Sequence, residues 1–203
     1  MGEEGVNQQY LFVYGLMAEG MVHFEKIKDF IKSVATGKTK GTMYRLKSGY
    51  PVLLQEGQDL IHGNLLELNS SDLLWHLLDE FYGYNLQDPN KSFYRRETTE
   101  VWVNEDMKVA SVYVMSPEKI PPTAQLIFGG DWQQALRQFP PLSEQLTDKQ
   151  KNYVLRLGSS SSREIVPIDM TLYRELMSLE LIVDKGRRLA LSSFGQELYR
   201  HLK

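Results

Sequence analysis

The sequence predicts an α+β fold in two parts, and three observations support this. Short apolar, β-rich runs alternate with turn residues through the first two-thirds of the chain. Among them, residues 70–81 carry one apolar stripe at helical spacing. Beyond residues 142–146, apolar residues recur mainly at helical spacing. We therefore predict a β-rich domain over residues 1–142 and a small, mostly helical domain over residues 147–203.

The first domain opens with a strand and a helix. The run Gln9–Tyr14 is apolar and β-rich and stops at Gly15, as expected for a buried strand. Residues 21–31 place apolar side chains at the spacing of an amphipathic helix.

Further strands follow. Residues 36–54 predict strands that are broken at Gly37, at Gly41 and at a turn over residues 48–51. Residues 60–68 predict one more strand before the helix.

The amphipathic helix and a hairpin complete this domain. Ser70 or Ser71 suits the N-cap of the helix, and Gly83 suits its end. Two β-rich runs, residues 94–103 and 109–114, then flank a polar turn and predict a hairpin. A short helix is expected over residues 132–139.

The second domain predicts two helices, a hairpin and a last helix. Thr147 caps a helix to Leu157, and residues 167–179 form the second helical stretch. Two short β-rich pieces lie within residues 181–191, and Ser192 caps the final helix. This order is the layout of a winged-helix domain.

Composition excludes several functions. The net charge of −3 argues against a protein coated in nucleic acid, and the absence of cysteine excludes disulfides and thiol catalysis. The four histidines lack metal-ligand spacing, so we expect no metal and no cofactor. No apolar run approaches the roughly 20 residues that span a bilayer. Residues 1–9 are polar, unlike a secretory signal, so we expect a cytoplasmic protein without a membrane partner.

Six short segments occur in the order found in one known family. They are FVYGLM at residues 12–17 with Gly20, GTMY at 41–44 with GYP at 49–51, LDEFYG at 78–83, SFYRR at 92–96, ASVYV at 110–114 and GDW at 130–132. Each is weak alone, but six in order within residues 9–135 are specific. This part of the chain resembles the γ-glutamylcyclotransferase-like (AIG2-like) family of transferases.

The resemblance implies a mixed β-barrel with helices packed on it and a pocket for a small γ-glutamyl-type ligand. In the family, backbone N–H groups of the loop after the first strand bind the ligand's carboxylate, as an amide nest does. The matching substrate-binding positions are Tyr14, Gly15, Leu16, Met17, Tyr94, Arg96 and Tyr113. Leu16 replaces the family's Thr or Ser, so one side-chain donor is missing. From the residues alone, these tyrosines fit the core equally well, and Arg96 fits a strand-face ion pair.

The resemblance also locates the chemistry. In active members the substrate's α-amine attacks its own γ-carbonyl to form 5-oxoproline, and a glutamate carries the proton. Tyr82 occupies that glutamate's position. A phenol with a pKa of about 10 is a poor base at neutral pH. We therefore expect a weakly active protein or a ligand-binding pseudoenzyme.

An active enzyme with a rearranged acid/base is the alternative. Tyr82 itself is one candidate, as a remodelled site residue, and Glu80 is another. In a helix, residues two apart face about 200° apart, whereas in an extended chain Glu80 would share a side with Tyr82. Glu67 and Glu97 lie on predicted strands and are further candidates.

The second domain carries a modest positive charge. Residues 147–203 hold 10 Lys and Arg against 7 Asp and Glu. If the domain binds DNA, the contacts would come from Arg174, Lys185, Arg187 and Arg188. Glu175 and Glu180 oppose this, and winged helices also bind proteins or pack within a chain. The partner of this domain is therefore either DNA or protein.

Overall fold

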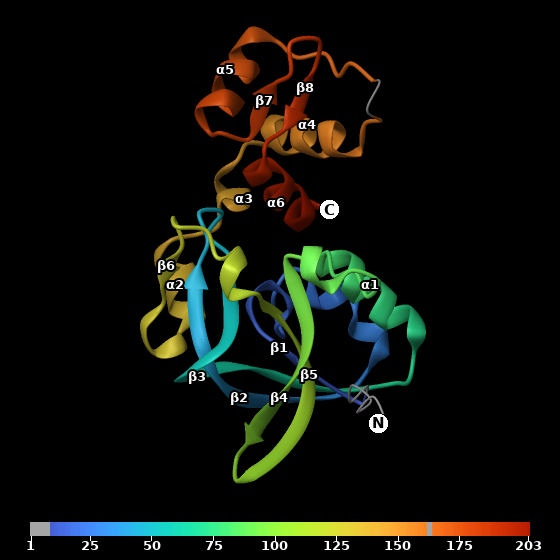
Figure 1. Ribbon diagram of the computed structural model, residues 1–203, viewed down its shortest axis with the longest axis vertical. Helices are drawn as coiled ribbons and strands as arrows, with labels where there is room; N and C mark the ends of the chain where they lie inside the picture. The colour runs from blue at the N-terminus through green and yellow to red at the C-terminus, as the bar shows by residue number, and fades with distance from the viewer. Residues whose placement is uncertain (1–8, 162–163) are drawn as a thin grey trace. The chain divides into compact units, whose positions relative to one another are not determined.

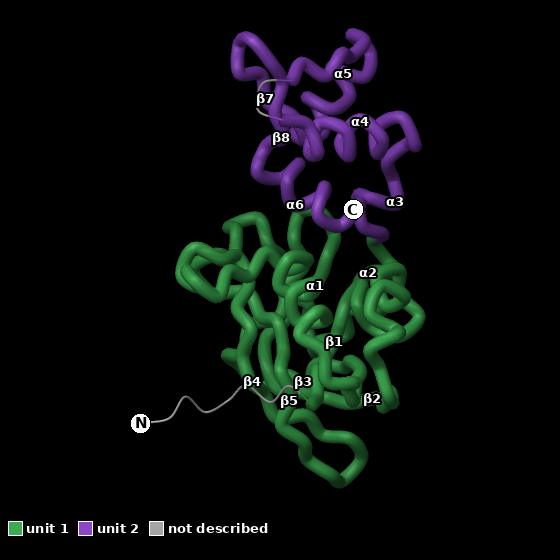
Figure 2. The backbone as a smooth tube through the Cα atoms, turned by 90° about the vertical axis from the view of Figure 1, so that its right-hand side faces the viewer, with its two compact units in different colours: residues 1–139 green, residues 140–203 purple. Residues whose placement is uncertain are grey.

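The computed structural model describes residues 9–161 and 164–203. The chain divides into two compact units, Met1–Phe139 and Pro140–Lys203, which Figure 2 shows in green and purple. The N-terminal stretch that we compared with a secretory signal lies almost wholly outside the described residues. No helix in the described ranges is long and apolar enough to cross a membrane.

The first unit is a closed, five-stranded mixed β-barrel, as predicted (Figure 1). The strand order is β3-β1-β5-β4-β2, and β2 pairs with β3 to close the barrel. Only the β1–β5 pair among these is parallel. A short strand, β6, adds to β2 outside the barrel. The strands are β1 (Tyr10–Val13), β2 (Ile31–Arg45), β3 (Pro51–Leu68), β4 (Tyr94–Val103), β5 (Asp106–Met115) and β6 (Gln125–Leu126).

The predicted breaks at Gly37 and Gly41 are wrong, because β2 runs through both as one strand. A Cβ on Gly37 would lie 2.7 Å from Cγ1 of Val101. A Cβ on Gly41 would lie 2.4 Å from the carbonyl oxygen of Leu54, beside a shift in the β2–β3 register. These glycines therefore permit close approach of neighbouring strands rather than ending a strand.

The helix predicted over residues 21–31 is also wrong. Two 3-10 turns, η2 (Phe24–Lys26) and η3 (Lys28–Phe30), occupy this segment, and β2 begins at Ile31. Phe24 and Ile27 are buried in the barrel core. Residues three apart face the same way in a 3-10 turn as well as in an α-helix, so the spacing did not separate the two.

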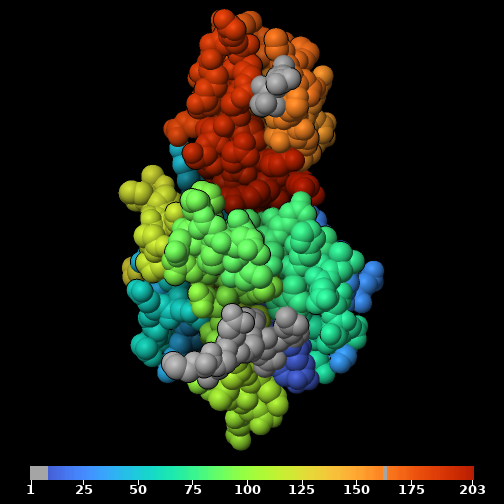
Figure 3. All heavy atoms as spheres, turned by 45° about the vertical axis from the view of Figure 1, so that its right-hand side comes forward, coloured from blue at the N-terminus to red at the C-terminus, as the bar shows by residue number. Residues whose placement is uncertain are grey.

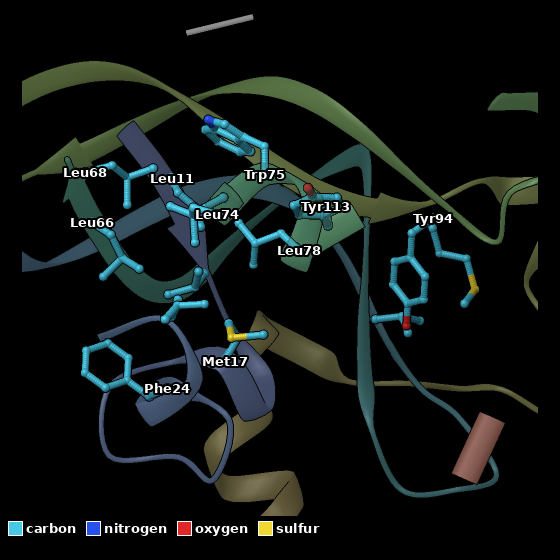
Figure 4. Close-up of a cluster of buried hydrophobic side chains, with 14 of the residues drawn as sticks. Leu11, Met17, Phe24, Leu66, Leu68, Leu74, Trp75, Leu78, Tyr94 and Tyr113 are labelled. Carbon is cyan, nitrogen blue, oxygen red and sulfur yellow. The ribbon is translucent and has the colours of Figure 1, made fainter. Parts of the chain in front are cut away.

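Helix α1 (Asp72–Tyr82) closes one side of the barrel. Its N-cap is Ser71, whose side chain accepts a hydrogen bond from the backbone N–H of Leu74. Leu74, Trp75 and Leu78 are buried against the strands, and Figure 4 shows them among the core side chains. Burying a leucine side chain stabilises a fold by about 1.5–3 kcal/mol, so this stripe holds the helix in place.

Shorter elements complete the first unit. Helix α2 (Trp132–Gln138) is held to the barrel by Trp132, whose indole N–H donates to the carbonyl oxygen of His62 at 2.6 Å. The elements are η1 (Gly15–Met17), η4 (Pro89–Lys91), η5 (Pro117–Lys119), η6 (Phe128–Gly130) and α2 (Trp132–Gln138).

The second unit has its own core and the predicted order of long elements. Thr147, Asp169 and Ser192 cap its three longer helices through their side chains. Residues 160–169 separate the first two of these helices, whereas the turn of a helix-turn-helix has three or four residues. The elements are α3 (Leu142–Gln145), α4 (Asp148–Ser159), α5 (Met170–Ser178), β7 (Ile182–Asp184), β8 (Leu189–Leu191) and α6 (Ser193–Leu202).

Candidate functional site

Three tyrosines from different elements meet at the last turn of α1, and we call Tyr82, Tyr94 and Tyr113 the tyrosine cluster. The rings of Tyr82 and Tyr113 are stacked, with centroids 4.2 Å apart and planes 9° apart. The Tyr94 ring is tilted by 59° at 5.3 Å from Tyr82. Residues 94 and 96 pair with residues 115 and 113 across the β4–β5 hairpin, so the register places both strand tyrosines near one another.

Tyr14 connects the first strand to this cluster. Its hydroxyl donates to the carbonyl oxygen of Tyr113 at 2.9 Å and accepts from the backbone N–H of Leu53 at 3.2 Å. Burial raises the pKa of Tyr14 above its usual value. The neutral phenol therefore ties β1, β3 and β5 together at the start of the loop after β1.

The loop after β1 can offer a ligand its backbone more readily than its side chains. Leu16 and Met17 are buried, and Met17 belongs to the barrel core. Gly15 has φ of 60°, and a Cβ there would lie 3.0 Å from Cγ of Pro51. The first N–H groups of the 3-10 turn η1 have no partner within the turn.

Asp79 is a site residue that the motif comparison did not single out. Its Oδ1 accepts a hydrogen bond from the Tyr113 hydroxyl at 2.5 Å, and its Oδ2 lies 3.4 Å from Nη1 of Arg96. Burial raises the pKa of Asp79, while Tyr113 and Arg96 oppose the rise. The sequence signal was available, because Asp79 lies three residues before Tyr82 and so shares its helix face.

Arg96 is enclosed by aromatic rings. Its guanidinium carbon lies 5.0 Å from the ring centroid of Trp75 and 5.7 Å from that of Tyr84. Only 11% of its side chain is exposed. Arg96 is therefore a fixed positive charge beside Asp79, held by cation–π contacts as well as by the ion pair.

The three glutamates weighed from the sequence lie in other settings. Glu80 is exposed on α1, and its helical backbone turns it about 200° away from Tyr82. Glu67 accepts a hydrogen bond from Ser33 at 3.1 Å. Glu97 follows Arg96 on β4 and therefore faces the other side of the sheet.

The phenols of Tyr82 and Tyr113 are neutral near pH 7. Burial raises the pKa of Tyr82 well above its usual value, and nearby Tyr14 adds to this effect. Burial also raises the pKa of Tyr113, and its hydrogen bond to Asp79 raises it further. Beside these phenols, which keep their protons, the carboxyl of Asp79 is the group that can accept or release a proton.

A separate pocket of about 210 Å³ lies beside β6, η6 and α2. The guanidinium of Arg45 borders it, donating to the carbonyl oxygen of Phe139 at 3.0 Å and lying over the Phe139 ring. The residues that line it do not include the substrate-binding residues predicted from the sequence. It therefore offers a different position for a small ligand from the tyrosine cluster.

The residues predicted to contact DNA lie on two elements of the second unit. Arg174 is exposed on α5, and Lys185 and Arg187 are exposed in the β7–β8 turn. The backbone N–H of Lys185 donates to the carbonyl oxygen of Arg188 at 2.9 Å, which closes that turn. DNA binding by this unit stays a prediction.

The atoms of α1 and of the segments that follow it form one continuous surface over the first unit (Figure 3). Figure 4 shows Trp75 and Leu78 of α1 beside Tyr113. Asp79 and Tyr82 lie on the same helix, so α1 positions both of them against β5.

Residues 11–134 match the family model described as Gamma-glutamyl cyclotransferase, AIG2-like. The chain is similar to the solved structure of YkqA from Bacillus subtilis, with 22% identity and a TM-score of 0.48 over 68% of this chain and 43% of that chain. It thus spans less than half of the length of the B. subtilis protein.

Two further solved structures are similar over a larger share of their own length. An AIG2-like protein from Mus musculus has 22% identity and a TM-score of 0.44, covering 56% of this chain and 80% of that one. A protein from Arabidopsis thaliana has 21% identity and a TM-score of 0.43, covering 64% of this chain and 83% of that one. No curated protein sequence matches the chain.

Proposed function

Because this chain belongs to the gamma-glutamyl cyclotransferase, AIG2-like family, we propose that its barrel binds a small γ-glutamyl-type ligand and catalyses cyclotransfer only weakly. The observation that carries the proposal is the position of Tyr82. It stands where the family motif has its glutamate, and its ring stacks on Tyr113. The position that should hold a base is therefore occupied by a packed, neutral phenol.

The proposed ligand lies where the loop after β1, the end of α1 and the start of β4 approach one another. Support comes from Tyr14, which bonds to Tyr113, and from Tyr82, which contacts Tyr94. Backbone N–H groups near Gly15 suit the carboxylate of the ligand, because consecutive amides form an anion-binding nest. The tyrosine rings suit its hydrocarbon chain.

Weak catalysis is expected because position 82 has no base to remove a proton from the substrate's amine. The α-amine of a γ-glutamyl compound is mostly ammonium at neutral pH and cannot attack until it loses a proton. General-base help contributes about 10²- to 10⁴-fold to such a step. Positioning by the loop acts separately and supports a residual rate. A rearranged acid/base is the second candidate, favoured by the carboxyl of Asp79 beside the cluster.

Amide NMR titration tests the binding proposal. We expect 5-oxoproline and γ-glutamyl ethylamide to shift the amide signals of residues 14–17, 79–84 and 94–96. Gly15→Ala should weaken binding, because a Cβ there presses on Pro51. Gly20→Ala is the matched control, since Gly20 also has positive φ but its Cβ would meet nothing within 4 Å.

Two outcomes contradict the proposal. The absence of any shift with both compounds removes the γ-glutamyl-type ligand. Shifts confined to the residues around the pocket beside β6 and α2 place the ligand elsewhere.

A further inference from the structure

We propose that Asp79 carries the proton in this site, in place of the glutamate that position 82 lacks, and that the hydroxyl of Tyr113 links it to the substrate amine. The inference rests on the proposed function, because it needs a γ-glutamyl-type ligand at the tyrosine cluster. It names the acid/base group of that site.

The ring of Tyr113 connects Asp79 to position 82, where the family motif has its base. Asp79 and Tyr82 lie three residues apart on α1, and residues at this spacing are neighbours on a helix surface. Tyr82 contacts the face of the Tyr113 ring, and Asp79 contacts the hydroxyl of that same ring. The side chain at the position that the family motif gives to its base and the carboxylate of Asp79 therefore both contact Tyr113.

The surroundings suit a carboxyl that exchanges a proton. The Asp79 side chain is 20% exposed, so it is shielded from water without being sealed off. The groups that face it are the Tyr113 hydroxyl on β5, the Arg96 guanidinium on β4 and His76 on α1. Burial raises its pKa against all three, which strengthens it as a base.

The proposed step is a relay with a balanced proton count. The substrate's ammonium gives a proton to the oxygen of Tyr113 as Tyr113 gives its own proton to Asp79. The freed amine then attacks the γ-carbonyl carbon and forms the C–N bond of the lactam. As the bond to the leaving amine breaks, this proton returns along the same path to the leaving nitrogen, which restores the carboxylate of Asp79. The attacking nitrogen still carries a second proton, which passes along the same path to the departing amine, so that the products are a neutral lactam and an ammonium.

A bracing role for Asp79 is the competing explanation, because its contacts also fix α1 to the hairpin. The two roles differ in their pH signature. The charge of Arg96 holds the pKa of Asp79 lower than burial alone would place it. In Arg96→Gln the acidic limb of the kcat profile should therefore move to higher pH. Bracing alone predicts no such movement.

The test measures 5-oxoproline release from γ-glutamyl ethylamide by the full chain across a range of pH, with binding measured in parallel. We expect Asp79→Asn to lower kcat by about 10²- to 10⁴-fold while the protein still binds 5-oxoproline. Asp79→Glu should restore part of the rate, and Asp72→Asn, an exposed carboxyl on the same helix, should leave it unchanged. If Asp79→Asn does not fold, the pH profiles of the wild type and Arg96→Gln decide the matter.

Four results overturn the inference. Turnover by Asp79→Asn equal to the wild type does so, and so does an acidic limb that stays in place in Arg96→Gln. Binding of both compounds by the wild type without any release of 5-oxoproline defeats the role of Asp79 but leaves the ligand-binding function standing. Failure to bind either compound defeats both.

Discussion

The carboxylate of Asp79 accepts a hydrogen bond from the hydroxyl of Tyr113 at 2.5 Å, joining the last turn of α1 to strand β5 near the end of that strand. The same tyrosine stacks on Tyr82 and accepts a hydrogen bond at its carbonyl from Tyr14. Tyr113 therefore contacts two of the segments from which the candidate site is built, the end of α1 and the start of the loop after β1. A substitution of Asp79, Tyr82 or Tyr14 therefore also removes a contact of Tyr113.

The first prediction concerns Tyr82→Glu, which should raise 5-oxoproline release above the wild-type rate. A carboxylate at this position can take the ammonium proton directly, without the relay through Tyr113, so the rate should rise by part of the roughly 10²- to 10⁴-fold that a well-placed general base contributes. Tyr82→Gln is the control, because glutamine has nearly the size of glutamate but no carboxylate that could act as a base. Equal rates in the two variants would show that space, rather than proton transfer, had limited turnover. Strong wild-type activity lost in Tyr82→Phe would show that the phenol itself is catalytic.

The second prediction concerns the pH dependence of stability at Asp79. Burial raises the pKa of Asp79 in the folded state above the ordinary value of 3.8 that it has in the unfolded chain. At a pH between the unfolded and the folded pKa, the folded chain therefore binds more protons than the unfolded chain. The stability that Asp79 confers, relative to Asp79→Asn, should thus be greatest below about pH 4 and fall as pH rises. Urea unfolding of both proteins from pH 3.5 to 7 measures the difference. A difference that grows with pH would mean that the pairing with Arg96 outweighs burial.

The third prediction tests what holds α1 to the barrel. Leu74 is fully buried, whereas its neighbour Leu73 is 58% exposed. Leu74→Ala should lower the free energy of unfolding by about 2–5 kcal/mol, and Leu73→Ala by less than about 0.5 kcal/mol. All three tryptophans lie within residues 1–139, so their fluorescence reports unfolding of this unit. Similar losses in both variants would contradict the assigned face of the helix.

The fourth prediction concerns the second unit. The hydroxyl of Ser192 accepts from the backbone N–H of Gly195 and donates to the carbonyl oxygen of Glu180, which has a positive φ. Ser192→Ala should destabilise the unit by about 1–2 kcal/mol, while Ser193→Ala, one residue along, should have little effect. Far-UV circular dichroism follows the helices, and tryptophan fluorescence should show the first unit unchanged. Loss of stability in Ser193→Ala but not in Ser192→Ala would show that Ser192 is not the N-cap of α6.

Sequence patterns predicted the elements whose signals are local. The stripe of α1 with its serine cap, the β4–β5 hairpin and the caps at Thr147 and Ser192 each depend on residues close in the chain, and the structure has them. The errors arose where a neighbour distant in sequence decided the outcome. Gly41 was predicted to break a strand, whereas in the structure it lies within β2 and lets the carbonyl of Leu54 approach closely.

The candidate site divides in the same way. Motif order singled out Tyr14, Tyr82, Tyr94 and Tyr113, and contacts between them are present. Asp79 escaped notice because its importance comes from a hydrogen bond to a residue 34 positions later. Its place in the LDEFYG segment and its helical spacing from Tyr82 were the signals in the sequence that could have indicated it.

The pairing of β1 sets the order in which the first unit can be assembled. Residues 10–13 pair with residues 64–67, and residues 11 and 12 also pair with residues 111 and 112. During synthesis, on the order of ten seconds separate the appearance of β1 from that of its parallel partner. The apolar first strand must remain without that partner for this time, available to chaperones or to a second nascent chain. Contacts so distant in sequence also slow refolding, so the barrel should regain its structure later than the second unit.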